Sequence, residues 1–280
     1  MDLKDFKTLA RNYKVIWFDS YGVLKNHAGV IPGIRETLQM LNEAGIEFYV
    51  LTNDASRSPL KLAQKYQDAG VKEIQPEMMI SSGMLARDYL EAKVKGGIVA
   101  YLGTPESAHY IRTAGMETLA VSEMNLKEAD NVNALVLLDD EGFDWERDLN
   151  KAVNLLRVRN IPVVVANSDR TYPVSGGQVA IAIGGLANMM EQMVSKKFLR
   201  FGKPDTQMFH YAYSQLRPEI SKKDILMVGD TLLTDILGGN KFGIDTALVL
   251  TGNTLGKKVN SRIEITGIIP TYIAASVGKQ

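Results

Sequence analysis

The sequence predicts an α/β fold, with a parallel sheet, helices on both faces, and a second α/β domain inserted into it. Two stretches, 14–19 and 48–53, are apolar runs of strand length that end in polar residues. Runs this apolar suit strands that are covered on both faces. A helical pattern follows each run, and the same alternation returns at 225–250 after a long stretch with a pattern of its own.

The N-terminal block alternates strand and helix. Residues 14–19 and 48–51 are predicted strands. Residues 34–44 and 58–70 are predicted helices, because apolar residues recur there at helical spacing and a glycine ends each segment. Strand, helix, strand, helix is typical of a right-handed βαβ series.

The C-terminal block continues the series with strands at 225–228 and 246–250 and a helix at 232–241. Between the blocks we expect strands at 97–101, 134–138 and 162–166 and helices at 106–114 and 145–159. This stretch is long enough to bury a core of its own. We therefore expect a discontinuous core domain, 1–82 and 196–280, and an inserted α/β domain, 83–195.

Composition excludes several kinds of function. Lys plus Arg and Asp plus Glu number 32 each among 280 residues, so no basic excess favours nucleic acid or an anionic membrane as partner. The absence of cysteine excludes disulfides, thiolate catalysis and Cys-ligated zinc. No apolar run has signal-peptide length or reaches the roughly 18 to 20 residues of a membrane helix, so the expected location is the cytoplasm.

Polar residues follow three predicted strands at the ends where ligands bind in open α/β sheets. They are Asp19, the pair Thr52 and Asn53, and Asp230. A single carboxylate at a strand end is commonly a helix cap or a turn former. Three such ends that meet at one edge of the sheet indicate chemistry instead.

The carboxylates form an oxygen-rich set without sulfur or imidazole. Asp235 lies five positions after Asp230, in the first turn of the following predicted helix, where it also suits the helix dipole. Together with Asp19, these oxygens are ligands that Mg²⁺ prefers. Clustered acids need a counter-charge, and Lys203, between a glycine and a proline, is the candidate.

Four short segments of the sequence resemble the motifs of a known protein superfamily. Residues 19–24 (Asp-Ser-Tyr-Gly-Val-Leu) resemble the first motif of the haloacid dehalogenase (HAD) superfamily. Residues 51–53, 202–204 and 229–235 are similar to its second, third and fourth motifs, in the same order and at the same strand ends. The resemblance covers essentially the whole chain and implies a Rossmann-like HAD core.

A subclass can be named by the same kind of resemblance. Residues 52–58 (Thr-Asn-Asp-Ala-Ser-Arg-Ser) are similar to the corresponding stretch of the class IIA phosphatases. Those enzymes carry an α/β cap where the insertion lies here, and 166–169, with Pro173 and Gly176-Gly177, resembles a segment of their caps. The tail 245–252 is also similar to theirs. The resemblance implies a small phosphorylated metabolite as substrate and allows a homodimer.

The resemblance also implies roles for single residues. Asp19 is the nucleophile and forms an aspartyl-phosphate that water hydrolyses. Mg²⁺ is the expected cofactor, held by Asp19, Asp230, Asp235 and the backbone carbonyl of Tyr21. The phosphoryl oxygens are bound by Thr52, Asn53, Lys203 and backbone amides of the first motif, that of Gly22 included. Asn167 and Asp169 of the cap are expected to contact the substrate.

Tyr21 departs from the phosphatase pattern. Phosphatases of the superfamily have an aspartate there, as general acid and then base, and such a group contributes about 10²- to 10⁴-fold. A phenol with an unperturbed pKa near 10 can serve as an acid but is a poor base. Two other functions therefore stay open beside a phosphatase: a phosphate-binding or regulatory protein without turnover, and a 2-haloacid dehalogenase.

The Asp-x-Tyr-Gly pattern resembles the first motif of 2-haloacid dehalogenases, whose halide leaving group needs no proton. Those enzymes are metal-independent and lack the acidic fourth motif that Asp230 and Asp235 supply here. Their cap is smaller, helical and inserted after the first motif, whereas this insertion follows the second. These differences favour the phosphatase.

Overall fold

The chain divides into two compact units. The computed structural model describes residues 2–94, 96–175 and 178–278. The core unit consists of Met1–Thr52, Pro59–Ile80 and Lys203–Gln280, and the inserted unit of Asn53–Ser58 and Ser81–Gly202. The sequence placed the boundaries at 82/83 and 195/196. The glycine pair at 176–177, noted above as resembling a cap segment, lies outside the described residues.

The short segment Asn53–Ser58 belongs to the inserted unit, which the sequence did not predict. Two hydroxyl groups at the start of the next helix explain this. The Ser81 hydroxyl donates to the carbonyl of Asp54 at 2.6 Å, and the Ser82 hydroxyl to that of Asn53 at 3.0 Å. These bonds tie the segment to residues distant from it in sequence.

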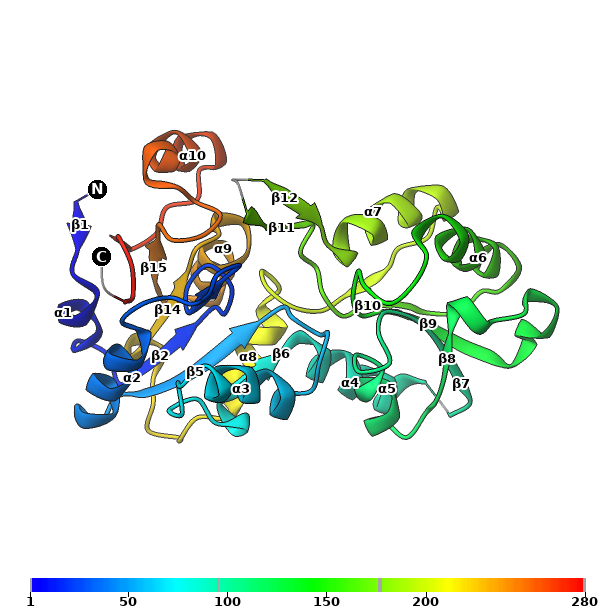
Figure 1. The fold of residues 1–280 in the computed structure, drawn as a ribbon, viewed down its shortest axis with the longest axis horizontal. Coiled ribbons are helices and arrows are strands. Elements are labelled where there is room, and N and C mark those ends of the chain that lie inside the picture. The colour runs from blue at the N-terminus through cyan, green and yellow to red at the C-terminus, as the bar shows by residue number, and fades with distance from the viewer. Residues whose placement is uncertain (1, 95, 176–177, 279–280) are drawn as a thin grey trace. The chain divides into compact units, whose positions relative to one another are not determined.

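The core unit is built on a seven-stranded sheet (Figure 1). Across the sheet the strands are β1 (Leu3–Lys4), β16 (Tyr272–Ala274), β15 (Asp245–Val249), β14 (Ile225–Gly229), β2 (Val15–Phe18), β5 (Glu47–Thr52) and β6 (Met79–Ser81). Every described pairing from β1 to β5 is parallel. A small hairpin, β3 (Lys25–Asn26) and β4 (Gly29–Val30), follows β2.

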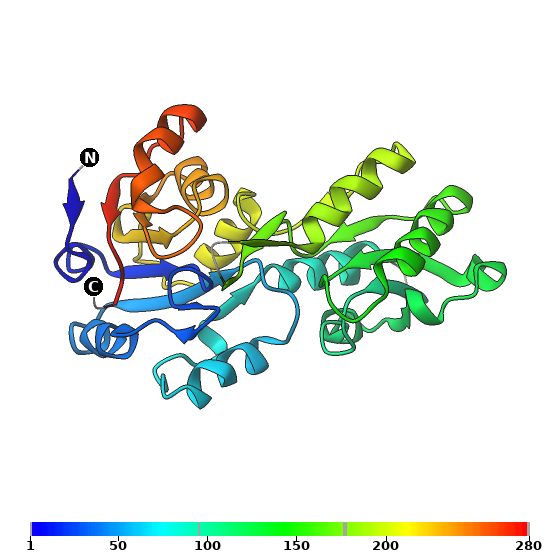
Figure 2. The same cartoon turned by 45° about the horizontal axis from the view of Figure 1, so that its top comes forward.

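Helices cover both faces of this sheet, as Figure 2 shows. One face packs on α1 (Phe6–Ala10), α2 (Ile34–Glu43) and α3 (Pro59–Asp68), and the other on α8 (Thr206–Ser214), α9 (Leu237–Phe242) and α10 (Val259–Thr266). Strand alternation explains the two layers. In β2, Ile16 and Phe18 join the first layer, whereas Trp17 packs against Phe209 and Phe242 of the second. The predicted α/β fold is confirmed.

The inserted unit has a five-stranded parallel sheet of its own. Its strands, in order, are β13 (Leu199–Arg200), β10 (Val163–Val165), β9 (Val132–Leu137), β7 (Ile98–Leu102) and β8 (Glu117–Ala120). The amphipathic helices α6 (Trp145–Val158) and α7 (Ile183–Val194) bury their apolar side chains against one face. Two further helices, α4 (Ser82–Lys93) and α5 (His109–Thr113), and a hairpin of β11 (Thr171–Pro173) and β12 (Val179–Ile181) complete the unit (Figure 1).

None of the helices in the described ranges has the length and apolar character needed to cross a membrane.

Candidate active site

Three carboxylates meet at the carboxyl ends of two neighbouring strands. Asp19 follows β2 and Asp230 follows β14, and these strands pair in parallel. Asp235 lies in a π-helical turn, Leu232–Ile236, that precedes α9. Each of the three offers an oxygen, and these oxygens all lie within 4.8 Å of one another. Asp230 and Asp235 are 1% exposed, so the acids are set into the core unit rather than displayed on its surface.

Lys203 neutralises part of this cluster. Its Nζ lies 2.5 Å from Asp19 Oδ1 and 2.7 Å from Asp235 Oδ1, and it donates to the Leu51 carbonyl at 2.8 Å. Burial alone lowers the pKa of Lys203, but the negative charges of Asp19 and Asp235 outweigh burial and hold the pKa above its usual value. The lysine therefore stays protonated at neutral pH.

The charge of the cluster suits a divalent cation. Three carboxylates and one ammonium group leave a formal excess of two negative charges. Burial raises the pKa of Asp230 well above its usual range, and the neighbouring charges of Asp19 and Asp235 raise it further. A bound cation would relieve this repulsion, and the all-oxygen donor set is of the kind that Mg²⁺ takes. The residues present thus fit the metal that the sequence predicted.

Three further predicted residues, Tyr21, Gly22 and Thr52, also belong to the core unit. Tyr21 is half-buried, and burial raises the pKa of its phenol. Gly22 has a φ of +87°, which glycine adopts without strain, and its amide donates to the carbonyl of Lys25 at 2.7 Å. That amide is therefore occupied within the loop rather than directed to a ligand. Thr52 is buried at the end of β5.

The remaining predicted residues form one hydrogen-bonded group in the inserted unit. The side-chain amide of Asn53 donates to Asp169 Oδ1 at 2.9 Å, and Asn167 Oδ1 accepts from the amide of Asp169 at 2.9 Å. Asn53 also reaches the Ser168 hydroxyl at 3.4 Å. The structure thus divides the predicted site residues into a carboxylate and lysine cluster in the core unit and an amide-rich group in the inserted unit.

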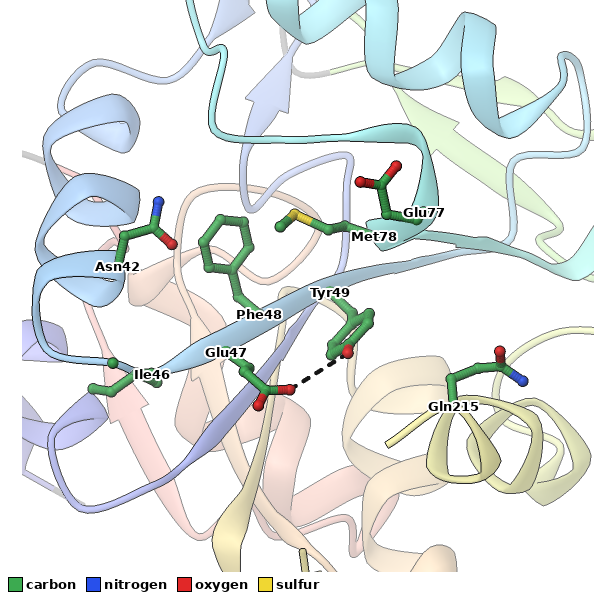
Figure 3. A pocket seen from close by; sticks show the side chains of 9 residues that line it. Asn42, Ile46, Glu47, Phe48, Tyr49, Glu77, Met78 and Gln215 are labelled. Atoms are coloured by element: carbon green, nitrogen blue, oxygen red, sulfur yellow. Dashed lines mark hydrogen bonds between the residues drawn. The ribbon is translucent and has the colours of Figure 1, made fainter. Parts of the chain in front are cut away.

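A groove of about 500 Å³ in the core unit is not suited to a phosphate. It lies along the first half of β5, beside Phe48 and Met78, whereas Thr52 ends that strand. Glu47 and Glu77 place negative charge at the groove, and the Tyr49 hydroxyl donates to Glu47 at 3.5 Å (Figure 3). Glu47 is paired with Arg217, and none of the described residues that line the groove is a lysine or an arginine. The carboxylate cluster contains the buried Lys203 and is therefore the better candidate for a phosphate.

Sequence reasoning missed several residues that hold the cluster in place. The Ser20 hydroxyl bonds to the Tyr66 hydroxyl of α3 at 2.7 Å, directly beside Asp19. Thr231, Thr251 and Asn253 hydrogen-bond to the loops after β2 and β14. The similarity of the tail 245–252 to class IIA phosphatases was a signal for this region, but it assigned no role to a residue.

Comparisons with known proteins agree with the geometry. A family model described as haloacid dehalogenase-like hydrolase matches residues 16–117, and one described as HAD-hydrolase-like matches residues 200–279. Chronophin of Mus musculus is 31% identical over 269 residues, which cover 94% of this chain and 90% of that protein.

Solved structures give the same result. The crystal structure of a possible sugar phosphatase of the HAD superfamily from Cytophaga hutchinsonii is 55% identical, with a TM-score of 0.96 over 100% of this chain and 99% of that one. A glycerol phosphate phosphatase from Mycobacterium tuberculosis, in complex with magnesium, shares the fold at 23% identity and a TM-score of 0.77, over 96% of this chain and 77% of that one. The chain therefore belongs to the haloacid dehalogenase-like hydrolases and is a phosphatase of their class IIA type.

Proposed function

We propose that the protein is a Mg²⁺-dependent hydrolase of small phosphate monoesters that works through an aspartyl-phosphate on Asp19. The observation that carries this proposal is the partly exposed Asp19, whose carboxylate pairs with the buried Lys203 and lies within 4.8 Å of oxygens of the buried Asp230 and Asp235. A carboxylate at this position has a fixed cation beside it and belongs to a cluster whose remaining negative charge needs a second cation. The magnesium in the related glycerol phosphate phosphatase structure supports the identity of that second cation.

In the first step, a carboxylate oxygen of Asp19 attacks phosphorus, and the bond from phosphorus to the leaving oxygen breaks. In the second, water attacks the phosphorus and the bond from phosphorus to the Asp19 oxygen breaks. Inorganic phosphate and free Asp19 result, and a proton of the water passes to solvent. Lys203 stays protonated throughout and offsets negative charge on the phosphoryl oxygens, while Thr52 contributes a hydroxyl donor. Asp19, Asp230, Asp235 and the Tyr21 carbonyl would hold Mg²⁺, which would supply further positive charge beside those oxygens.

Tyr21 sets the limits of this chemistry. Because burial raises the pKa of its phenol, the side chain is protonated at neutral pH. A protonated phenol cannot take a proton from the attacking water, and the raised pKa also makes it a weak proton donor to a leaving oxygen. We expect turnover to be slow on alkyl phosphates and faster on esters whose leaving group needs no proton.

Restoring a carboxylate at Tyr21 tests the proposal. Tyr21→Asp should raise turnover of an alkyl phosphate such as glycerol phosphate by about tenfold or more, and turnover of p-nitrophenyl phosphate by less. Tyr21→Phe is the matched control, since it keeps the ring and removes the proton donor. Asp19→Asn should abolish both activities. Phosphate release is measured with and without Mg²⁺, and metal affinity by calorimetry, because the new charge lies beside the metal ligands.

Two outcomes would contradict this reading. If Tyr21→Asp binds the metal normally but its turnover of the alkyl phosphate does not rise, a missing acid-base is not what limits the enzyme. If the wild-type protein binds vanadate with Mg²⁺ and releases no phosphate from sugar phosphates, glycerol phosphate or p-nitrophenyl phosphate, it is a phosphate-binding protein.

A further inference from the structure

One loop of the core unit contacts both loops that carry the cluster. Residues 250–255 follow β15, which lies beside β14 on the side away from β2. The Thr251 hydroxyl donates to the Gly22 carbonyl at 2.5 Å, and the main-chain amide of Asn253 donates to Asp230 Oδ2 at 2.5 Å. The loop that follows β15 thus contacts both loops that present Asp19 and Asp230.

Asn253 acts on both oxygens of the Asp230 carboxylate. Its main-chain amide binds Oδ2, and its side-chain amide donates to the Thr231 hydroxyl at 2.8 Å. Because an amide nitrogen can only donate, the Thr231 hydroxyl accepts from Asn253 and directs its own proton to Asp230 Oδ1, 3.0 Å away. The carboxylate is therefore held at one oxygen directly and at the other through Thr231.

Steric contact restricts the same carboxylate. A Cβ atom placed on Gly22 would lie 2.3 Å from Asp230 Oδ2, and one placed on Gly252 would lie 1.9 Å from it. The Asp230 side chain therefore fits between two glycines that can accept no side chain. Hydrogen bonds and close packing together fix the plane of a buried carboxylate that its acidic neighbours repel.

We propose that Asn253 is a positioning residue that orients Asp230 for the cation, and that its side chain sets the affinity of the site for Mg²⁺. This inference rests on the proposed metal-dependent function. Groups that orient a ligating side chain contribute about 10- to 100-fold to metal affinity. Asn253→Ala removes the side-chain donor but leaves the main-chain amide, so we expect Mg²⁺ affinity about tenfold weaker.

The test is calorimetric titration of Mg²⁺ into protein stripped with EDTA. Thr231→Val removes the hydroxyl that accepts from Asn253 and donates to Asp230. The double variant of Thr231→Val with Asn253→Ala should lose little more Mg²⁺ affinity than either single variant. Thr231→Ser keeps the hydroxyl and should restore near wild-type affinity. Asn240→Ala is the matched control, because that side chain bonds instead to Thr246 and to the Ile269 carbonyl. Its Mg²⁺ affinity should not change.

The results separate this inference from the proposed function. Absence of Mg²⁺ binding by the wild-type protein would refute the metal-dependent function itself. Wild-type binding together with an Asn253→Ala affinity within twofold of it would refute only the positioning role. If Asn253→Ala does not fold, the comparison of Thr231→Val with Thr231→Ser decides, and equal affinities for those two variants would overturn the inference.

Discussion

Lys203 pairs with two carboxylates inside the core unit, and its replacement by methionine leaves those charges without their ammonium partner. The lysine side chain is 1% exposed, as is that of Asp235 at 2.7 Å, so little solvent screens the pair. Breaking a buried ion pair at one side costs about 3–5 kcal/mol. Against a typical free energy of unfolding of about 5–15 kcal/mol, Lys203→Met should be severely destabilised in EDTA.

Urea denaturation in EDTA at pH 7.5 measures how much the free energy of unfolding falls in Lys203→Met. Lys14→Met is the matched control, because the Lys14 side chain is 61% exposed and its pair with Asp224 should be worth at most about 1 kcal/mol. The double variant Lys203→Met/Asp235→Asn should recover part of the deficit, since it removes one unpaired charge. Equal losses in Lys203→Met and Lys14→Met would refute the reasoning.

Three further predictions each concern the replacement of one side chain. Asp230→Asn should abolish the heat of Mg²⁺ binding in calorimetry, and undiminished binding would place the metal elsewhere. Tyr66→Phe removes the buried hydrogen bond to the Ser20 hydroxyl at 2.7 Å and so loosens the loop that carries the nucleophile. In steady-state assays kcat should fall severalfold while KM stays nearly constant. A change in KM alone would contradict this expectation. Burial, helped by the charges of neighbouring acids, raises the pKa of Asp139 to about 7. The folded state therefore holds an extra proton from pH about 4 to 7, and the stability that this proton brings is lost as pH rises through 7. At pH 8 the free energy of unfolding of Asp139→Asn should exceed that of the wild type by about 1–2 kcal/mol, a figure that allows for the partial exposure of Asp139. At pH 5 the two should differ little. Equal differences at the two pH values in thermal unfolding would refute a pKa of about 7 for Asp139.

The sheet and the meeting of the acids could be predicted because both follow from local patterns. β2 and β14 are short runs in which every side chain is buried, and such runs stand out in the sequence. Their carboxyl ends lie at one edge because the strands are parallel, so Asp19 and Asp230 had to come close. Lys203 was predicted from charge balance, from its place between a glycine and a proline, and from the resemblance of residues 202–204 to the third HAD motif.

The features that were not predicted depend on contacts between distant residues. The predicted helix 232–241 begins with a π-helical turn, and the Asp235 carboxylate accepts from the Thr231 amide at 3.1 Å across that turn. The bonds of Asn253 depend on where its main-chain amide points after β15, and no periodicity of side chains encodes that direction. Sequence patterns report which face a side chain takes and not which donor a loop presents.

The position of β14 in the middle of the sheet has a consequence for how the protein is made. β2 pairs with β14 in a register that joins Val15 to Ile225, so a ribosome must add the whole inserted unit before the two strands can meet. Until then one edge of β2 is unpaired, and its four side chains, all fully buried in the folded protein, remain exposed. Such exposed apolar edges pair with other chains, and long-range parallel pairing is slow. We expect nascent or truncated chains that stop before residue 225 to need chaperones and to aggregate when expressed alone.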